Sequence, residues 1–175
     1  MNVACVLASG FEDSEFKQPY DALRQAGHSV TIIGMQAGQQ LSGDKGKETA
    51  TTEKAFSDVS PDQYDALFIP GGASPDRLRA QPAPVSFVKA FFEKEKPVFA
   101  ICHGPQLFLT AGTHRGRRLT AWKTVQGDLS LAGADVVDQE VVVDRNLVTS
   151  RQPQDLPAFI RESLRLLEKV PSAKT

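Results

Sequence analysis

Cys102, His103, Gly104 and Pro105 carry the strongest chemical signal in the sequence, and they directly follow the apolar segment Val98–Ile101. A buried strand that runs into a tight turn and then a helix has the geometry of a nucleophile elbow, here with sulfur in place of a serine oxygen. A helix N-terminus favours the thiolate, and the adjacent imidazole could accept or return a proton. We therefore expect Cys102 to be a reactive nucleophile. The alternative is a small buried cysteine without chemistry.

A carboxyl group is expected beside this cysteine. The segment Ser9–Phe16 follows the apolar run Val3–Ala8, so Glu12 can point into the same crevice. Burial would keep such a carboxyl protonated and able to donate a hydrogen bond to the thiolate, whereas two ionised groups would repel each other. The alternative role for Glu12 is helix capping, which Asp13 or Ser14 could supply equally well.

Backbone donors are expected nearby as well. The segment Ala66–Ile69 ends in Pro70-Gly71-Gly72, a turn that exposes N–H groups. Together with the N–H of His103, these groups could bind the oxyanion of a tetrahedral intermediate. The segment Leu147–Pro157 supplies further polar groups before the last helix. All four stretches lie where strands end, the edge at which open α/β sheets bind ligands.

The elements that must position these residues alternate between short apolar strands and amphipathic helices. The expected strands are Val3–Ala8, Ser29–Gly34, Ala66–Ile69 and Val98–Ile101. The expected helices are one before Gly27, Ala83–Lys94, one after Cys102 that ends near Gly112, Val125–Ala132 and Asp155–Lys169. Two segments, Gln40–Phe56 and Asp135–Ser150, are typical of hairpins. The pattern predicts a flavodoxin-like three-layer α/β sandwich with a mainly parallel sheet and additional β-hairpins.

The composition narrows the class of protein. A chain of 175 residues with a formal net charge of −1 predicts one domain, residues 1–175, and no nucleic-acid partner. The basic run His114–Arg118 is expected to be a solvated turn, with a phosphate-binding patch as the alternative. No apolar stretch is long enough for a membrane span. Two cysteines, Cys5 and Cys102, without metal-like spacing indicate a reducing cytoplasm, and no motif implies a cofactor or a metal.

Four motifs resemble the signatures of the DJ-1/PfpI superfamily, most closely its PfpI branch. They are Gly-Phe-Glu-Asp-Ser-Glu-Phe (10–16), Ile-Pro-Gly-Gly (69–72), Ala-Ile-Cys-His-Gly-Pro-Gln (100–106) and Thr-Ser-Arg-Gln-Pro-Gln-Asp-Leu-Pro-Ala-Phe (149–159). The resemblance implies a Cys102 nucleophile hydrogen-bonded to Glu12, with His103 as general acid or base.

The same resemblance implies further site residues and a homo-oligomer, either a dimer or a hexamer. Gly72, Ala73 and the backbone of His103 would take the oxyanion role. An acidic third member would come from a neighbouring subunit, where this chain has Asp76 in place of the glutamate of the family pattern.

Two functions are therefore expected. The first is a stress-response cysteine hydrolase that acts on carbonyl adducts, as a deglycase or glyoxalase does, or on peptides. The alternative is a non-enzymatic redox sensor or chaperone that uses oxidation of Cys102.

Overall fold

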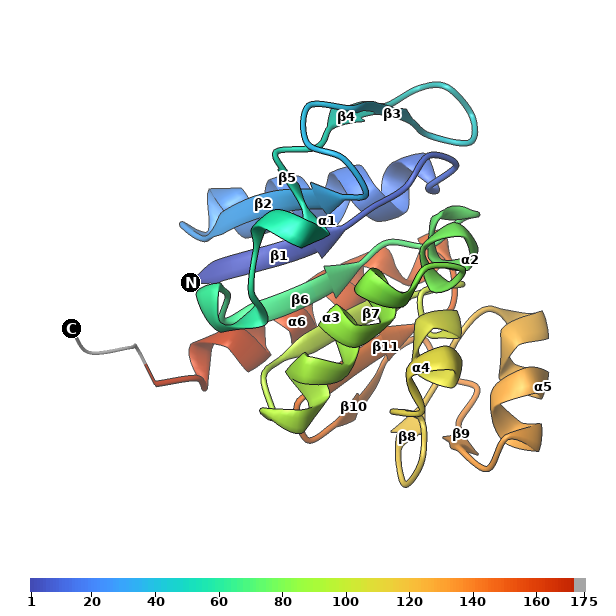
Figure 1. The fold of residues 1–175 in the computed structure, drawn as a ribbon. Helices are drawn as coiled ribbons and strands as arrows, with labels where there is room; N and C mark the ends of the chain where they lie inside the picture. The colour runs from blue at the N-terminus through green and yellow to red at the C-terminus, as the bar shows by residue number, and fades with distance from the viewer. Residues whose placement is uncertain (172–175) are drawn as a thin grey trace.

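A seven-stranded sheet forms the centre of the computed structural model, which describes residues 1–171 (Figure 1). Its strand order is β10-β11-β7-β6-β1-β2-β5, and every neighbouring pair is parallel except β10 and β11. The strands are β1 (Asn2–Val6), β2 (Ser29–Gly34), β5 (Lys54–Ala55), β6 (Ala66–Ile69), β7 (Val98–Ile101), β10 (Val142–Asp144) and β11 (Leu147–Ser150). The predicted mainly parallel sheet is confirmed.

Helices cover both faces of this sheet and make three layers. They are α1 (Asp13–Gln25), α2 (Ser74–Arg79), α3 (Pro82–Glu93), α4 (Gln106–Ala111), α5 (Lys123–Leu131) and α6 (Leu156–Glu168). Side chains alternate along a strand, so Val3 of β1 packs in the core under α1 and α6, while Ala4 packs in the core under α3, α4 and α5. The inner strands are buried on both faces, as their continuous apolar runs require.

Two small sheets and three short 3₁₀ turns decorate the sandwich. The segment Gln40–Phe56, predicted to form a hairpin, contains β3 (Gln40–Ser42) and β4 (Thr49–Thr51). These two strands pair antiparallel. The 3₁₀ turns are Phe56–Asp58, Pro61–Gln63 and Pro153–Asp155. Among residues 1–171, no helix is both long and apolar enough to cross a membrane.

The second predicted hairpin, Asp135–Ser150, is only partly correct. Its second half forms the antiparallel pair β10 and β11, whereas β9 (Asp135–Val136) pairs in parallel with β8 (Arg118–Leu119). The backbone N–H of Val137 continues this pairing by donating to the carbonyl of Leu119 at 2.9 Å. The polar residues that follow β9 therefore connect two different sheets instead of closing one turn.

Candidate active site

Cys102 lies on a sharp backbone turn at the carboxyl end of β7. Its φ of 63° is in the left-handed region that residues other than glycine rarely adopt. Two backbone hydrogen bonds hold it there: its N–H donates to the carbonyl of Ser150 at 3.0 Å, and its carbonyl accepts from the N–H of Trp122 at 2.9 Å. A Cβ on Gly104 would lie 2.9 Å from the carbonyl oxygen of Ile69, so the turn requires glycine there. The predicted elbow is therefore present.

The carboxyl group that faces the thiol belongs to Glu15. Both side chains pack against the backbone of Gly71, where an added Cβ would collide with Oε1 of Glu15 and lie 2.8 Å from the Cβ of Cys102. Glu15 is completely buried, and within the described chain its oxygens have no other side-chain partner. The loop after β1, the turn after β6 and the elbow after β7 thus converge on one pair of titratable groups.

Glu12 does not occupy the place predicted for it. Its Oε2 accepts from the N–H of Glu15 at 2.8 Å and from the hydroxyl of Ser14 at 2.5 Å, and its Oε1 lies 3.5 Å from Nζ of Lys45. Glu12 is therefore the N-cap of α1, which is the alternative role that the sequence allows for it. The predicted contact between Glu12 and the sulfur is wrong, because the first turn of α1 places Glu15 toward the sheet.

A periodic signal in the sequence could have identified Glu15. The buried residues of α1 include Glu15, Pro19 and Leu23, which are spaced four residues apart and share one helix face. A charged side chain on the apolar stripe of a helix must be paired or neutral, and it is therefore a candidate functional group.

The electrostatics of this pair follow from burial. Burial and the charge of Glu12 raise the pKa of Glu15 to about 8, so its carboxyl keeps a proton at neutral pH. Burial also raises the pKa of Cys102, and an ionised Glu15 would raise it further, while the N–H groups of His103 and Gly72 lower it. The predicted position of Cys102 at a helix N-terminus is not formed, because α4 begins only at Gln106, one turn after the cysteine.

His103 is placed to accept the thiol proton. Its Nδ1 lies 3.3 Å from Sγ of Cys102, and its ring stacks on Trp122 with centroids 6.2 Å apart. Burial lowers the pKa of His103, although the charge of Asp76 opposes the shift. The imidazole is therefore neutral at neutral pH. Within residues 1–171, Asp76 makes no hydrogen bond or ion pair with this ring.

Two backbone N–H groups face the sulfur, those of Gly72 and His103. Gly72 has a φ of 78°, and a Cβ there would collide with the backbone of Glu12. The N–H of Ala73 is not available, because it donates to the carbonyl of Gly10 at 2.8 Å. Of the three predicted oxyanion residues, Gly72 and His103 lie at the sulfur, and Ala73 instead fixes the loop after β1.

The end of β11 and the polar segment after it stabilise the backbone next to the elbow. The backbone carbonyl of Ser150 accepts a hydrogen bond from the N–H of Cys102. The guanidinium of Arg151 donates to both carboxylate oxygens of Asp155, at 2.9 and 3.1 Å, and to Asp138 at 3.1 Å. This network holds the start of α6 against the segment that follows β9 and thereby fixes the position of β11 beside β7.

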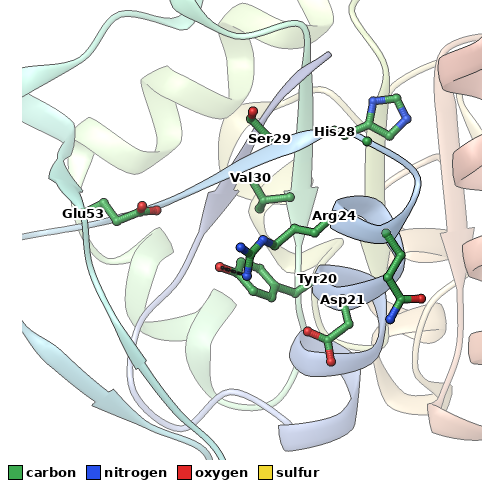
Figure 2. A pocket seen from close by; sticks show the side chains of 9 residues that line it. Tyr20, Asp21, Arg24, His28, Ser29, Val30 and Glu53 are labelled. Atoms are coloured by element: carbon green, nitrogen blue, oxygen red, sulfur yellow. Dashed lines mark hydrogen bonds between the residues drawn. The ribbon is translucent and has the colours of Figure 1, made fainter.

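A separate cavity of about 660 Å³ lies at the other end of the strands (Figure 2). The guanidinium of Arg24 lies over the ring of Tyr20 at 5.3 Å, with Asp21, His28 and Glu53 around them. These side chains come from α1, the loop after it and the segment before β5. Ser29, which starts β2, pairs with Asn2 at the amino end of β1, so this cavity is remote from Cys102.

Comparisons with known proteins find similar sequences over almost the whole chain. The DJ-1/PfpI family model matches residues 1–166. Protein/nucleic acid deglycase 2 of Escherichia coli is 52% identical over 94% of this chain and 96% of its own length. General stress protein 18 of Bacillus subtilis is 51% identical over 95% of this chain and 98% of its own.

A solved structure shows the same fold. A two-domain protein of Anabaena variabilis, with DJ-1/ThiJ/PfpI-like and ferritin-like domains, superposes with a TM-score of 0.93 at 34% identity. The similarity covers 99% of this chain and 52% of that one. Among residues 1–171, no group of three or more histidine, cysteine or acidic side chains is arranged to hold a metal ion.

Proposed function

Because the chain belongs to the DJ-1/PfpI family, we propose that it is a cysteine-dependent hydrolase that removes carbonyl adducts, in the manner named for its E. coli relative. One observation carries this proposal. The sulfur of Cys102 lies 3.3 Å from a neutral imidazole nitrogen of His103 and is faced by two backbone N–H groups. A nucleophile, a proton acceptor and oxyanion donors are the parts that attack on a carbonyl carbon needs.

The proposed reaction begins with a protonated thiol. In a hemiaminal adduct, the amine nitrogen and a hydroxyl are both bonded to the former carbonyl carbon. Sγ of Cys102 forms a bond to that carbon as the C–N bond breaks, and the thiol proton passes through Nδ1 of His103 to the leaving amine. The N–H groups of Gly72 and His103 stabilise the negative charge that develops on the hydroxyl oxygen. Water then displaces the sulfur from the carbon, its proton returns to Sγ through His103, and the carbonyl compound leaves as its hydrate. Glu15 stays protonated throughout and hydrogen-bonds the sulfur whenever it is anionic.

Adducts on protein amines are the preferred substrates over peptide bonds. A peptide bond is stabilised by resonance, and its amine leaves only when a well-oriented acid protonates it. Within one chain, Asp76 acts on His103 only through its charge. The name of the E. coli relative includes nucleic acids as well as proteins, so adducts on nucleobases form a second substrate class within the proposal. We also propose a homo-oligomer of one domain per chain and a cytoplasmic location, which the two free cysteines support.

The test uses Cys102→Ala, with Cys5→Ala as the matched control because Cys5 is the other buried free cysteine and lies within β1. Release of methylglyoxal-derived adducts from acetylated lysine and arginine is followed by mass spectrometry. We expect no turnover above background for Cys102→Ala and near wild-type turnover for Cys5→Ala. Equal activity of the wild type and Cys102→Ala, with both proteins folded, would refute the hydrolase.

A second function, redox sensing, is favoured by the contact between Glu15 and Cys102. A protonated carboxyl could donate a hydrogen bond to a sulfinate formed on that sulfur. Intact mass under graded peroxide separates the two functions. A selective gain of two oxygens on Cys102 at low peroxide, without turnover of any adduct, would favour the sensor over the hydrolase.

A further inference from the structure

Three residues of the basic run His114–Arg118, namely Arg115, Gly116 and Arg117, line an open groove that the proposed function does not use. The groove has a volume of about 540 Å³ and lies between the end of α3, the loop from α4 to β8 and the turn from β10 to β11. Four cationic side chains line it: Lys89, Arg115, Arg117 and Arg145. In Figure 1 the loop from α4 to β8 lies near the bottom of the view, whereas α2 lies well above it on the same side of the molecule.

Arg117 is the feature of this groove that calls for a ligand. Its side chain is almost fully buried, at 8% exposure, and its guanidinium stacks on the ring of Phe92 at 5.2 Å. A guanidinium carries five N–H donors. In the described chain it makes a single side-chain hydrogen bond, from Nη1 to the carbonyl of Asp144 at 3.3 Å, and no ion pair. A buried charge without an ionic partner is costly, and an anion entering the groove would supply that partner.

The guanidinium of Arg145 lies close enough to that of Arg117 for their charges to interact. Arg145 adopts a φ of 56° in the turn between β10 and β11, donates to the carbonyl of Gly116 at 3.1 Å and pairs with the carboxylate of Asp144 at 3.2 Å. Burial and the charge of Arg145 both lower the pKa of Arg117, although the charges of Asp144 and Glu95 oppose this shift. The fold therefore holds two like charges close together, an arrangement that a shared anion stabilises.

The remaining charges leave the groove positive. Lys89 and Arg115 are exposed and form no ion pair within residues 1–171. Two carboxylates, Glu93 and Glu95, also line the groove and oppose the four cations. The carboxylate of Asp144 is already occupied by Arg145 and by the N–H of Arg118 at 2.9 Å.

We propose that this groove binds a phosphate group, with Arg117 as its central contact and Lys89, Arg115 and Arg145 around it. The planar guanidinium fork matches a phosphate with two parallel hydrogen bonds. The groove is separate from Cys102, because Arg145 precedes the amino end of β11 whereas the elbow follows the carboxyl end of β7. The proposal therefore does not depend on the hydrolase.

The shared chemistry is the phosphate, and two probes distinguish its sources. Inorganic phosphate represents the free anion, and a fluorescent oligonucleotide of ten thymidines represents a phosphodiester chain. We expect both to compete for one site on the full chain, with affinity that falls as salt is raised. A steep salt dependence for the oligonucleotide, with tighter binding than phosphate, would assign the groove to a polymer. Comparable affinity for both would assign it to a small anion.

The decisive variant is the double substitution Lys89→Ala with Arg115→Ala, because both side chains are exposed and the fold should survive. Lys54→Ala with Arg161→Ala removes the same charge from exposed positions elsewhere and is the matched control. We expect the first pair to weaken binding of both probes by about tenfold or more and the control to change it little. Arg117→Met, which keeps an apolar side chain over Phe92, should abolish binding. No binding of either probe, or equal loss in the two double variants, would overturn the proposal.

Discussion

At the scale of single residues, the chemistry of this protein depends on how Glu15 and Cys102 share protons. Both groups are buried, and an ionised Glu15 makes the thiol harder to ionise. A protonated Glu15 removes that charge and can donate to the sulfur instead. His103 then serves as the acceptor for the thiol proton, since burial keeps its imidazole neutral. The reactive state is thus one in which the acid retains its proton while the sulfur loses its own.

Replacement of the buried acid should change how stability depends on pH. The pKa of Glu15 is about 8 in the folded chain and about 4.3 when unfolded. Between these values only the folded chain holds the proton, so stability falls as pH rises, by up to about 1.4 kcal/mol per pH unit. We expect Glu15→Gln to flatten this decline in denaturant titrations between pH 5 and about 8. The exposed Glu140→Gln should keep the wild-type slope; an unchanged slope in Glu15→Gln would contradict the assigned pKa.

The charge of Glu12, the N-cap of α1, should influence the pKa of Glu15. Glu12→Gln keeps an oxygen that can accept from the N–H of Glu15 but removes the charge that raises the pKa of Glu15. We expect the titration midpoint of Glu15, followed by carboxyl ¹³C NMR, to fall by up to about one unit. Alkylation of Cys102 at neutral pH should slow accordingly. A midpoint that stays at the wild-type value would show that Glu12 acts only as a cap.

At the scale of elements, a buried carboxylate fastens the hairpin β3–β4 to the start of α1. Asp13 accepts from the backbone N–H groups of Lys45, Lys47 and Glu48 at 3.2, 2.7 and 2.9 Å. A Cβ on Gly43 would collide with this carboxylate, so the loop can lie this close to Asp13 only with glycine at position 43. The hairpin thereby packs on the same turn of helix that carries Glu12 and Glu15.

Loss of this anchor should loosen the hairpin. We expect Asp13→Ala to destabilise the protein by about 2–4 kcal/mol, because three backbone donors lose a charged acceptor, and to speed amide exchange between residues 43 and 48. Burial would raise the pKa of Asp13, but the three N–H groups lower it. The anchor is therefore complete above about pH 4 and weakens as pH falls. Asp128→Ala, at an exposed position, is the control, and equal exchange in both variants would argue against the anchor.

Elements defined by local pattern could be predicted, and those defined by distant contacts could not. The bounds of β2, β6 and β7 match the apolar runs in the sequence. A largely buried strand is a continuous apolar run, so it can be identified from the sequence without knowing which strands it pairs with. The elbow at Cys102 is likewise a local motif. The choice between Glu12 and Glu15 depends on which side of one helical turn meets the sheet. The pairing of β9 with β8 depends on partner residues seventeen positions away in sequence.

At the scale of the whole molecule, three loops from β1, β6 and β7 meet beside one another because the strand order reverses direction at β1. The chain first adds β2 and β5 on one side of β1, then crosses to β6 and β7 on the other. Sites in open α/β sheets form at such a reversal. The position of the site is therefore a property of the topology, while its substrate depends on what surrounds the mouth.

Asp76 is the residue whose role depends on assembly. Within one chain it influences the pKa of His103 without a hydrogen bond, and we propose that its partner lies in a neighbouring subunit. A mixture of Asp76→Ala and Cys102→Ala chains, dissociated and reassembled together, should then recover part of the activity that each lacks alone. Size-exclusion chromatography with light scattering would verify the oligomer. Mixed oligomers without recovered turnover would place Asp76 outside a shared site.

Gly71 sets a limit on how this protein can change. The acid and the sulfur meet across a backbone that has no room for even a methyl group, so their separation is fixed by main chain and cannot be adjusted by swapping a side chain between them. With the main chain fixed, charges at the rim of the pocket, such as that of Glu12, can still change the pKa of the acid beside the cysteine. Natural variation in reactivity should accordingly concentrate in the rim of the pocket, with the centre left unaltered.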